Sequence, residues 1–237
     1  MDKGKIIVIE GTDCSGKETQ TKRLIERLKE DGNKVISYSF PNYDSPTGKI
    51  VGGPYLGKPE IGESYFGEEA LRLDPKITSL YYAADRAYNL KDIDTYLDQG
   101  YYVLLDRYVS SNQAHQGGKV DDTDERLGVY QWIDDLEYGF LNLPKPDITI
   151  FLHVPFSYAK ELKKNRKSLD IHEKSDKHLL SAERSYLELA YIYRWNTIDC
   201  IKDGKLRTIE DISNEIYDIV NPRELSKENS KVLKKER

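Results

Sequence analysis

The amino-acid sequence predicts an α/β fold with three layers, in which a five-stranded parallel sheet is flanked by helices. Two observations predict it. Five short apolar runs, rich in β-branched residues, have the length of buried strands. Segments with helical apolar spacing separate these runs, and this alternation is typical of parallel strand–helix–strand units with right-handed crossovers. The expected strands are Lys5–Glu10, Lys34–Phe40, Tyr101–Leu105, Asp147–Val154 and Thr197–Ile201.

Capping residues mark the ends of the expected helices. A first helix runs from Gly16 to Asp31, where Gly32-Asn33 gives a C-cap signal. Asp74-Pro75, an N-cap followed by proline, begins a helix that Gly100 ends. Apolar positions of that helix form a stripe that we expect to be buried: Ile77, Leu80, Ala84, and Ala87 or Tyr88. The remaining helices are expected at Asp121–Gly139, from Pro155 onward, at Leu179–Trp195 and at Ile209–Val220.

Residues 41–73 have a different character. They contain six glycines and little helical periodicity, so we expect an irregular functional segment with a short helix near Gly48–Val51. With this segment included, residues 1–221 are expected to form one domain, followed by a charged tail at residues 222–237.

Composition argues against several classes of partner. The net charge of −5 is the opposite of what binding a polynucleotide backbone requires. No apolar stretch approaches membrane-spanning length, so we expect no membrane partner, and no signal peptide is apparent. Cys14 and Cys200 fit neither a metal site nor a disulfide framework, which favours a reduced, cytoplasmic location.

The first strand leads into Gly11-x-x-x-x-Gly16-Lys17, the spacing of a phosphate-binding loop, or P-loop. Glycines let backbone N–H groups turn inward around an anion, and the following helix N-terminus adds its positive dipole end. A plainer explanation is a glycine-containing strand–helix turn with a surface lysine. The strand before the loop and the helix after it favour nucleotide binding, and hence a P-loop fold.

Three further groups of residues are candidates for a site. Asp106-Arg107 follows the third strand, at the sheet edge where α/β proteins bind ligands, although an ion pair capping the strand would explain it too. Tyr82 and Arg86, four residues apart, share one helix face. Spacing alone would make them a core tyrosine and a solvated arginine. Residues 163–167 are strongly basic, which fits a lid or a solvated helix end.

Four blocks of sequence resemble the thymidylate kinase family, and the resemblance extends to about Val220. They are Glu10-Gly-Thr-Asp-Cys-Ser-Gly-Lys17 with Thr19-Gln20, Tyr82-Ala-Ala-Asp-Arg86, Asp106-Arg-Tyr-Val-Ser-Ser-Asn-Gln-Ala-His-Gln-Gly117, and Asp170-Ile-His-Glu173. The resemblance implies transfer of the γ-phosphoryl group of ATP to dTMP with Mg²⁺, and a homodimer whose contact face the long third helix would supply. Residues 41–73 would then form an acceptor-site loop region and residues 160–178 a lid.

The resemblance also implies roles for individual residues. The implied catalytic residues are Lys17, Asp106, Arg107 and Arg166. Contacts to ATP are implied for Gly11, Thr12, Asp13, Cys14, Ser15, Gly16, Lys17, Glu18 and Thr19. Contacts to the acceptor are implied for Asp13, Phe40, Tyr82, Arg86, Arg107, Ser111, Asn112, His115 and Gln116. Asp106 and Thr19 are the implied Mg²⁺ ligands.

The sequence departs from the family pattern in places. Glu18 stands where a Mg²⁺-binding hydroxyl is usual. Asn42, Tyr43 and Asp44 occupy the place of an acceptor-phosphate arginine, so Lys49 or another group of the loop region would have to substitute. His115 replaces an aromatic residue beside the sugar. Cys14 carries no positive charge, so Arg166 or Lys167 of the lid is expected to supply it.

Two alternatives stay open at this point. One is a kinase for another pyrimidine monophosphate or for a deoxynucleoside. The other is a P-loop module that binds ATP without turnover, an idea that Glu18 favours and that Lys17, Asp106 and Arg107 oppose.

Overall fold

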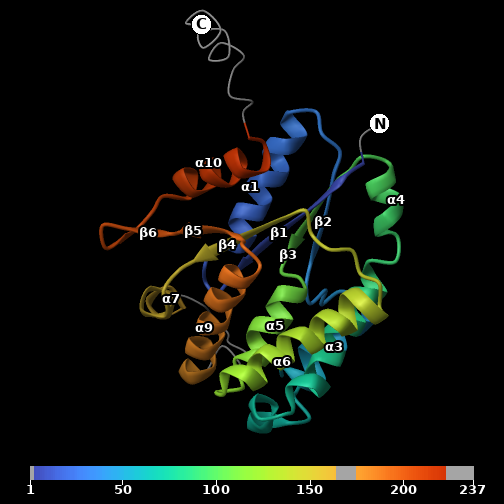
Figure 1. Cartoon of the computed structure of the whole chain (residues 1–237), viewed down its shortest axis with the longest axis vertical. Helices are drawn as coiled ribbons and strands as arrows, with labels where there is room; N and C mark the ends of the chain where they lie inside the picture. Colours follow the sequence, from blue (N-terminus) through green and yellow to red (C-terminus); the bar gives the residue numbers. More distant parts are fainter. Residues whose placement is uncertain (1–2, 164–174, 223–237) are drawn as a thin grey trace, which may run out of the picture.

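The computed structural model describes residues 3–163 and 175–222 (Figure 1). Its central sheet has the order β2-β3-β1-β4-β5, and all four neighbouring pairs are parallel. The strands are β1 (Lys5–Gly11), β2 (Val35–Ser39), β3 (Tyr102–Asp106), β4 (Ile148–His153) and β5 (Asn196–Asp199). The predicted fold class and all five predicted strands are confirmed, with ends that differ by one or two residues.

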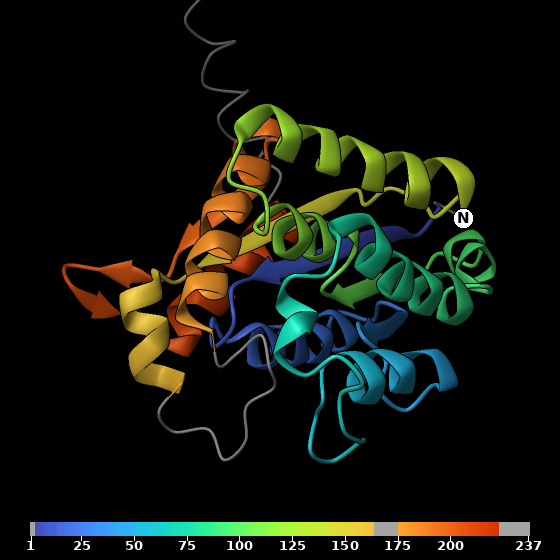
Figure 2. The same cartoon turned by 90° about the horizontal axis from the view of Figure 1, so that it is seen from below.

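Side chains alternate across the sheet and build a core on each face. Ile7 and Ile9 of β1 pack toward α1 (Lys17–Glu30) and α10 (Ile209–Val220). Ile6 and Val8 face the other way, toward α4 (Ile93–Asp98), α5 (Val109–Gly117) and α6 (Thr123–Asp134). On that second face, α9 (Asp176–Ile192) packs along α5. Figure 2 shows α5, α6 and α9 above the sheet and α1 below it.

The predicted helix from Asp74 to Gly100 is two helices, and its predicted buried stripe is wrong. α3 (Pro75–Asn89) begins at the Asp74 N-cap as expected, but the chain bends at Leu90 before α4 starts. The stripe residues Ile77, Leu80 and Tyr88 are 52%, 49% and 54% exposed. The buried face carries Thr78, Ser79, Ala83, Asp85 and Arg86 instead. This mostly polar face is inside because it packs on the equally polar helix α5.

Residues 41–73 are more ordered than their glycine content predicts. They form α2 (Pro46–Ile50), a π-helical turn η1 (Val51–Tyr55) and a 3₁₀ turn η2 (Gly67–Leu71), around a small core of Val51, Tyr55, Leu56 and Ala70. The short helix expected near Gly48–Val51 corresponds to α2 and the start of η1.

Lys119 fastens this segment to the end of α5. Its Nζ donates to the hydroxyls of Tyr55 and Thr78 and to the carbonyls of Ala70 and Leu73, all at 3.3–3.4 Å. Burial lowers the pKa of Lys119 to about 7. An amine with four oxygen partners satisfies the loop carbonyls that this fold would otherwise bury.

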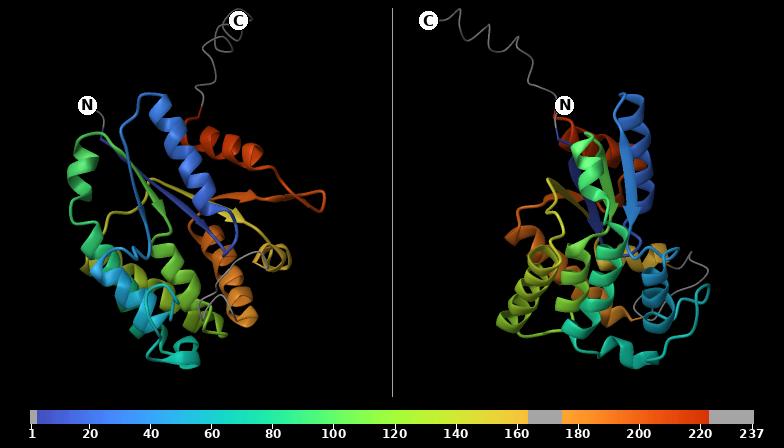
Figure 3. Two further views of the ribbon diagram at one scale, coloured as in Figure 1. Left: turned by 180° about the vertical axis from the view of Figure 1, so that it is seen from behind. Right: turned by 90° about the vertical axis from the view of Figure 1, so that its right-hand side faces the viewer.

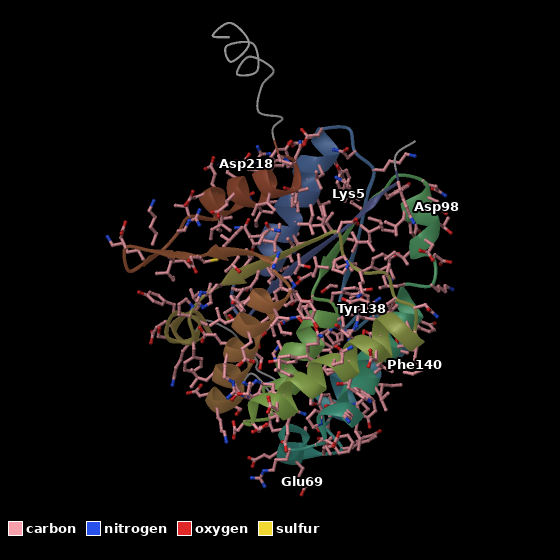
Figure 4. The ribbon with its side chains drawn as sticks, in the orientation of Figure 1. Lys5, Glu69, Asp98, Tyr138, Phe140 and Asp218 are labelled. Atoms are coloured by element: carbon pink, nitrogen blue, oxygen red, sulfur yellow. The ribbon has the colours of Figure 1, made fainter. Side chains whose placement is uncertain are left out.

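Several remaining elements differ in their ends. α6 is followed by a π-helical turn, η3 (Asp135–Phe140), in which Phe140 lies at the edge of the molecule (Figure 4). α7 (Phe156–Lys163) follows Pro155, and the predicted final helix is confirmed as α10. A hairpin of β6 (Ile201–Lys202) and β7 (Lys205–Leu206), which the sequence did not predict, projects from the sheet (Figure 3). Among the helices of the described residues, none is long and apolar enough to cross a membrane.

Candidate active site

A cavity of about 480 Å³ lies at the carboxyl ends of β1, β2 and β3. It brings together every residue for which acceptor contacts were predicted: Asp13, Phe40, Tyr82, Arg86, Arg107, Ser111, Asn112, His115 and Gln116. Loop residues 13–19 and Asp106 line it as well. Gly11 and Thr12, also predicted to contact ATP, are buried and do not line the cavity.

The loop after β1 depends on two glycines. A Cβ on Gly11 would come within 2.4 Å of the Ser15 hydroxyl and 2.8 Å of the Leu152 carbonyl oxygen. Gly16, the N-cap of α1, has a φ of 83°, in the left-handed region that favours glycine. These positions let the loop turn tightly into the helix, whose first N–H groups then point toward the cavity end of the loop.

Lys17 lies folded against this loop. Its Nζ donates to the carbonyl oxygens of Gly11 (2.9 Å) and Thr12 (2.7 Å) and to the Ser15 hydroxyl (3.4 Å). Burial, and next the neighbouring Arg107 guanidinium, lower the pKa of Lys17 to about 8. The ammonium group is thus weakly solvated and close to anion-binding N–H groups, which suits contact with a phosphate chain.

Arg107 stands over the same loop in a strained backbone conformation. Its φ is 67°, which only a few per cent of residues other than glycine adopt. The backbone N–H donates to the Ile9 carbonyl oxygen at 3.1 Å, and the guanidinium contacts the Asp13 carboxylate and the Tyr186 hydroxyl. Strain held by so many partners is a frequent feature of functional sites.

Glu10, for which the sequence predicted no role, organises this end of the sheet. It is fully buried, and its carboxylate accepts from the backbone N–H of Tyr108 and from the hydroxyls of Ser110, Ser111 and Tyr186. These bonds tie the start of α5 and the middle of α9 to β1. A charged residue closing an apolar strand was the signal that could have revealed it.

The other end of the cavity is built around Arg86, which is 1% exposed. Its Nε and Nη2 donate side by side to the two carboxylate oxygens of Glu137, both at 2.5 Å. Asn112 Nδ2 donates to Glu137 Oε1 at 2.9 Å and to the Ser79 carbonyl oxygen at 3.2 Å. Tyr82 lines the same end and meets Tyr55 edge to face. Glu137 was missed because it lies in an acidic stretch of the sequence that carries no local sign of its partner on another helix.

Two amide atoms at this end have no hydrogen-bond partner within the described part of the chain. They are the acceptor Asn112 Oδ1 and the donor Gln116 Nε2, both buried on residues that line the cavity. Arg86 lines the cavity as well, and its pairing with Glu137 uses Nε and Nη2, so that Nη1 lies outside this pair. Buried polar groups left unpaired in a folded protein call for an explanation, and a polar ligand supplies one.

Comparison with known proteins identifies the family of this chain. The family model described as thymidylate kinase matches residues 9–216. The chain belongs to the thymidylate kinase family. Thymidylate kinases from Plasmodium falciparum and Prochlorococcus marinus are each 32% identical to it, over 90% and 92% of this chain and 88% and 98% of their own. A solved thymidylate kinase structure from Candida albicans has a TM-score of 0.68 at 25% identity, covering 93% of this chain and 92% of its own.

In this member of the thymidylate kinase family, His115 stands where an aromatic residue beside the sugar was expected. Its Nδ1 lies 3.1 Å from Nε2 of His178 on α9, and the two rings stack. Burial lowers the pKa of both rings, that of His178 to about 4. Both imidazoles are therefore neutral near pH 7, and a role for His115 toward the substrate stays a prediction.

The loop region offers a lysine to the cavity, but at Lys58 rather than Lys49. Lys49, a predicted substitute for the acceptor-phosphate arginine, is exposed and does not line the cavity. Lys58 does line it, with Nζ 4.9 Å from the centre of the Tyr43 ring, and Tyr43 lines it too. Lys58 is thus a candidate for that group, and which residue contacts the acceptor phosphate stays a prediction.

The residues present fit a Mg²⁺ ion bound together with nucleotide phosphates. Asp106 and Thr19 both line the cavity and offer hard oxygen ligands. Glu18 lines it too, but its carboxylate pairs with Lys22 at 2.6 Å. Mg²⁺ is usually held by one or two carboxylates, water and substrate phosphates rather than by an all-protein cage. The described residues contain no group of three His, Cys, Asp or Glu side chains that could hold a metal ion.

The predicted lid lies largely outside the described residues. Arg166 and Lys167, and the block Asp170-Ile-His-Glu173, fall in residues 164–174. The predicted catalytic role of Arg166 therefore stays a prediction. Leu162 of α7, immediately before this segment, lines the cavity.

Proposed function

We propose that this protein transfers the γ-phosphoryl group of ATP to the 5′-phosphate of dTMP, giving ADP and dTDP. One observation carries the proposal: a single cavity joins a P-loop with its lysine to a charge-balanced pocket that presents unpaired acceptor and donor atoms. The P-loop end of the cavity suits a triphosphate, and the end at Arg86 suits a polar, uncharged ring.

The pocket is complementary to a pyrimidine dione. Thymine offers an N3–H donor flanked by two carbonyl oxygens. The pocket offers the unpaired acceptor Asn112 Oδ1, and Arg86, whose Nη1 is not engaged by Glu137, offers N–H donors. Cytosine has an acceptor at N3 and an amino donor at C4. It would therefore place an acceptor against Asn112 Oδ1 and a donor against the Arg86 guanidinium. A site that leaves buried polar groups unpaired with the wrong ligand discriminates strongly.

The reaction needs alignment and charge neutralisation more than covalent help. The acceptor phosphate, with a second pKa of about 6, is largely dianionic at neutral pH and needs no general base. Lys17 and the loop N–H groups would hold the donor phosphates, and Arg107 would lie between donor and acceptor. Bound Mg²⁺, held by Asp106 and Thr19, would supply a further positive charge at the donor phosphates.

A coupled assay of ADP release tests this function. With Mg·ATP, we expect dTMP to be the preferred acceptor among dTMP, dUMP, dCMP and thymidine, with dCMP poorest among the monophosphates because of its mismatched edge. Preference for dCMP would favour another pyrimidine monophosphate kinase, and preference for thymidine a nucleoside kinase. Release of ADP with none of the acceptors would favour a module that binds ATP without turnover.

We extend the proposal to a cytoplasmic homodimer formed through α3. Ile77, Leu80 and Tyr88 form an apolar stripe, each about half exposed, and such a stripe marks an interaction surface. Sedimentation velocity should give a dimer for the wild type and a monomer for Leu80→Glu. Tyr191→Glu, an equally drastic change at an exposed position of α9, should remain a dimer. A monomeric wild type, or a dimeric Leu80→Glu, would exclude this interface.

A further inference from the structure

Glu137 contacts two side chains at the base end of the cavity, those of Arg86 and Asn112, yet it does not line the cavity itself. It sits in the π-helical turn η3, next to Tyr138 (Figure 4), and is fully buried. Its two carboxylate oxygens accept three hydrogen bonds, two from Arg86 on α3 and one from Asn112 on α5. One carboxylate thus links three elements behind the pocket.

The hydrogen bonds to Glu137 decide which way the Asn112 amide points. Nδ2 faces Glu137 Oε1 and the Ser79 carbonyl oxygen, and both of these groups only accept. The reverse orientation would set the amide oxygen against two acceptors. Oδ1 is therefore the atom left unpaired at the cavity, where a ring N–H would meet it.

The same carboxylate decides which edge of Arg86 is available. Side-by-side bonding through Nε and Nη2 holds the guanidinium plane and leaves Nη1 as the nitrogen that Glu137 does not engage. The pairing also balances the guanidinium charge, so an uncharged base enters a pocket without net charge, away from the cationic groups at the phosphate end.

We infer that Glu137 is the positioning residue for base selection: without touching the substrate, it presents Asn112 as an acceptor and Arg86 as a donor to the pyrimidine. The inference rests on the proposed function, and it is consistent with the π-helical geometry of the turn that carries Glu137. A π-turn shifts the facing of the residues within it, and such turns are frequent at functional sites.

Glu137→Gln is the variant that tests the inference, because it keeps the shape and replaces one acceptor oxygen by an N–H₂ donor. Whichever way the new amide lies, it opposes at least one N–H group of Arg86 or Asn112. We expect KM for dTMP to rise roughly 10- to 100-fold, the range for a disturbed buried hydrogen bond, while KM for ATP changes little. The ratio of kcat/KM for dTMP over dCMP should fall by about tenfold or more.

Glu188→Gln is a matched control. Glu188 pairs side by side with Arg126 at 2.6 and 2.7 Å, in the same geometry, but neither residue lines the cavity. This variant should keep the wild-type ratio of dTMP to dCMP. A changed ratio there would mean that loss of any such pair disturbs selection, and would overturn the inference.

Other outcomes are equally decisive. A folded Glu137→Gln with the wild-type dTMP-to-dCMP ratio, or with KM for dTMP and ATP raised equally, would make Glu137 a structural residue only. If circular dichroism shows that this variant is unfolded, Glu137→Asp keeps the charge but shortens the reach, and should lower the same ratio. The acceptor preference of the wild-type enzyme tests the proposed function separately. A wild type that does not prefer dTMP would refute that function, whatever the variants do.

Discussion

Replacing Lys17 with alanine should lower kcat by roughly 10²- to 10³-fold, the scale of losing one oriented charge donor in a dry site. The Lys17 ammonium lies on the P-loop, held by the carbonyl oxygens of Gly11 and Thr12. A phosphate chain bound to the loop N–H groups would draw it to the β- and γ-phosphates, where charge develops during transfer. Steady-state assays with saturating dTMP and ATP measure the loss.

Two comparisons separate lost charge from lost packing. Lys17→Met fills most of the same space without charge and should be as inactive as Lys17→Ala. Lys29→Ala, at an exposed position near the end of α1, should behave as the wild type. If Lys17→Ala kept most of its turnover while folded, the P-loop would not be the donor site.

The pH profile gives Lys17 a second signature. Because burial and Arg107 hold the pKa of Lys17 near 8, the amine of the free enzyme is charged below that pH and loses its proton above it. We therefore expect kcat/KM for ATP to fall as pH rises through about 8, since this parameter reports groups of the free enzyme. That limb should be missing in Lys17→Met.

Local patterns predicted the strands and the P-loop because both depend on neighbours in the sequence. Ile7 and Ile9 are apolar wherever they pack, and the spacing from Gly11 to Lys17 is a property of one turn. Residues at strand ends, such as Asp106 and Arg107, followed from topology, because parallel strands end at one edge of a sheet.

Long-range polar packing accounts for what the sequence did not reveal. The apolar residues of α5 do not recur at helical spacing. The helix is buried nevertheless, because its serine and amide side chains donate hydrogen bonds to Glu10 on β1 and to Glu137 in η3. The face of α3 that looked polar is inside for the same reason, through Arg86 and its partner Glu137. An ion pair between residues 51 positions apart leaves no periodic signal. The apolar stripe of α3, which was predicted to be buried, lies on the surface instead.

Replacing Arg107 with alanine should have the largest effect, a loss in kcat of roughly 10³-fold or more, the scale of losing an arginine that neutralises a transferring phosphoryl group. The guanidinium lies between the P-loop and α5, in contact with the Asp13 carboxylate and 3.3 Å from Ser111 Oγ. It can thus reach a donor phosphate on one side and an acceptor phosphate on the other. Arg107→Lys should be nearly as inactive, because a single ammonium cannot make both contacts at once.

Two variants define what the loss in Arg107→Ala means. Arg207→Ala removes an arginine that pairs with Asp211 and Glu215 away from the cavity, and should leave kcat near the wild-type value. Lys58→Ala should raise KM for dTMP by roughly tenfold with little change in kcat, since we expect Lys58, a cavity residue of the acceptor-site loop region, to make one charged hydrogen bond to the acceptor. An Arg107→Ala enzyme that behaved like Lys58→Ala, with KM for dTMP raised and kcat retained, would show that Arg107 only holds the acceptor. A large loss in kcat at saturating dTMP and ATP would instead mean that its charge acts on the phosphoryl group in transfer, because interactions made only in the transition state lower kcat when they are removed.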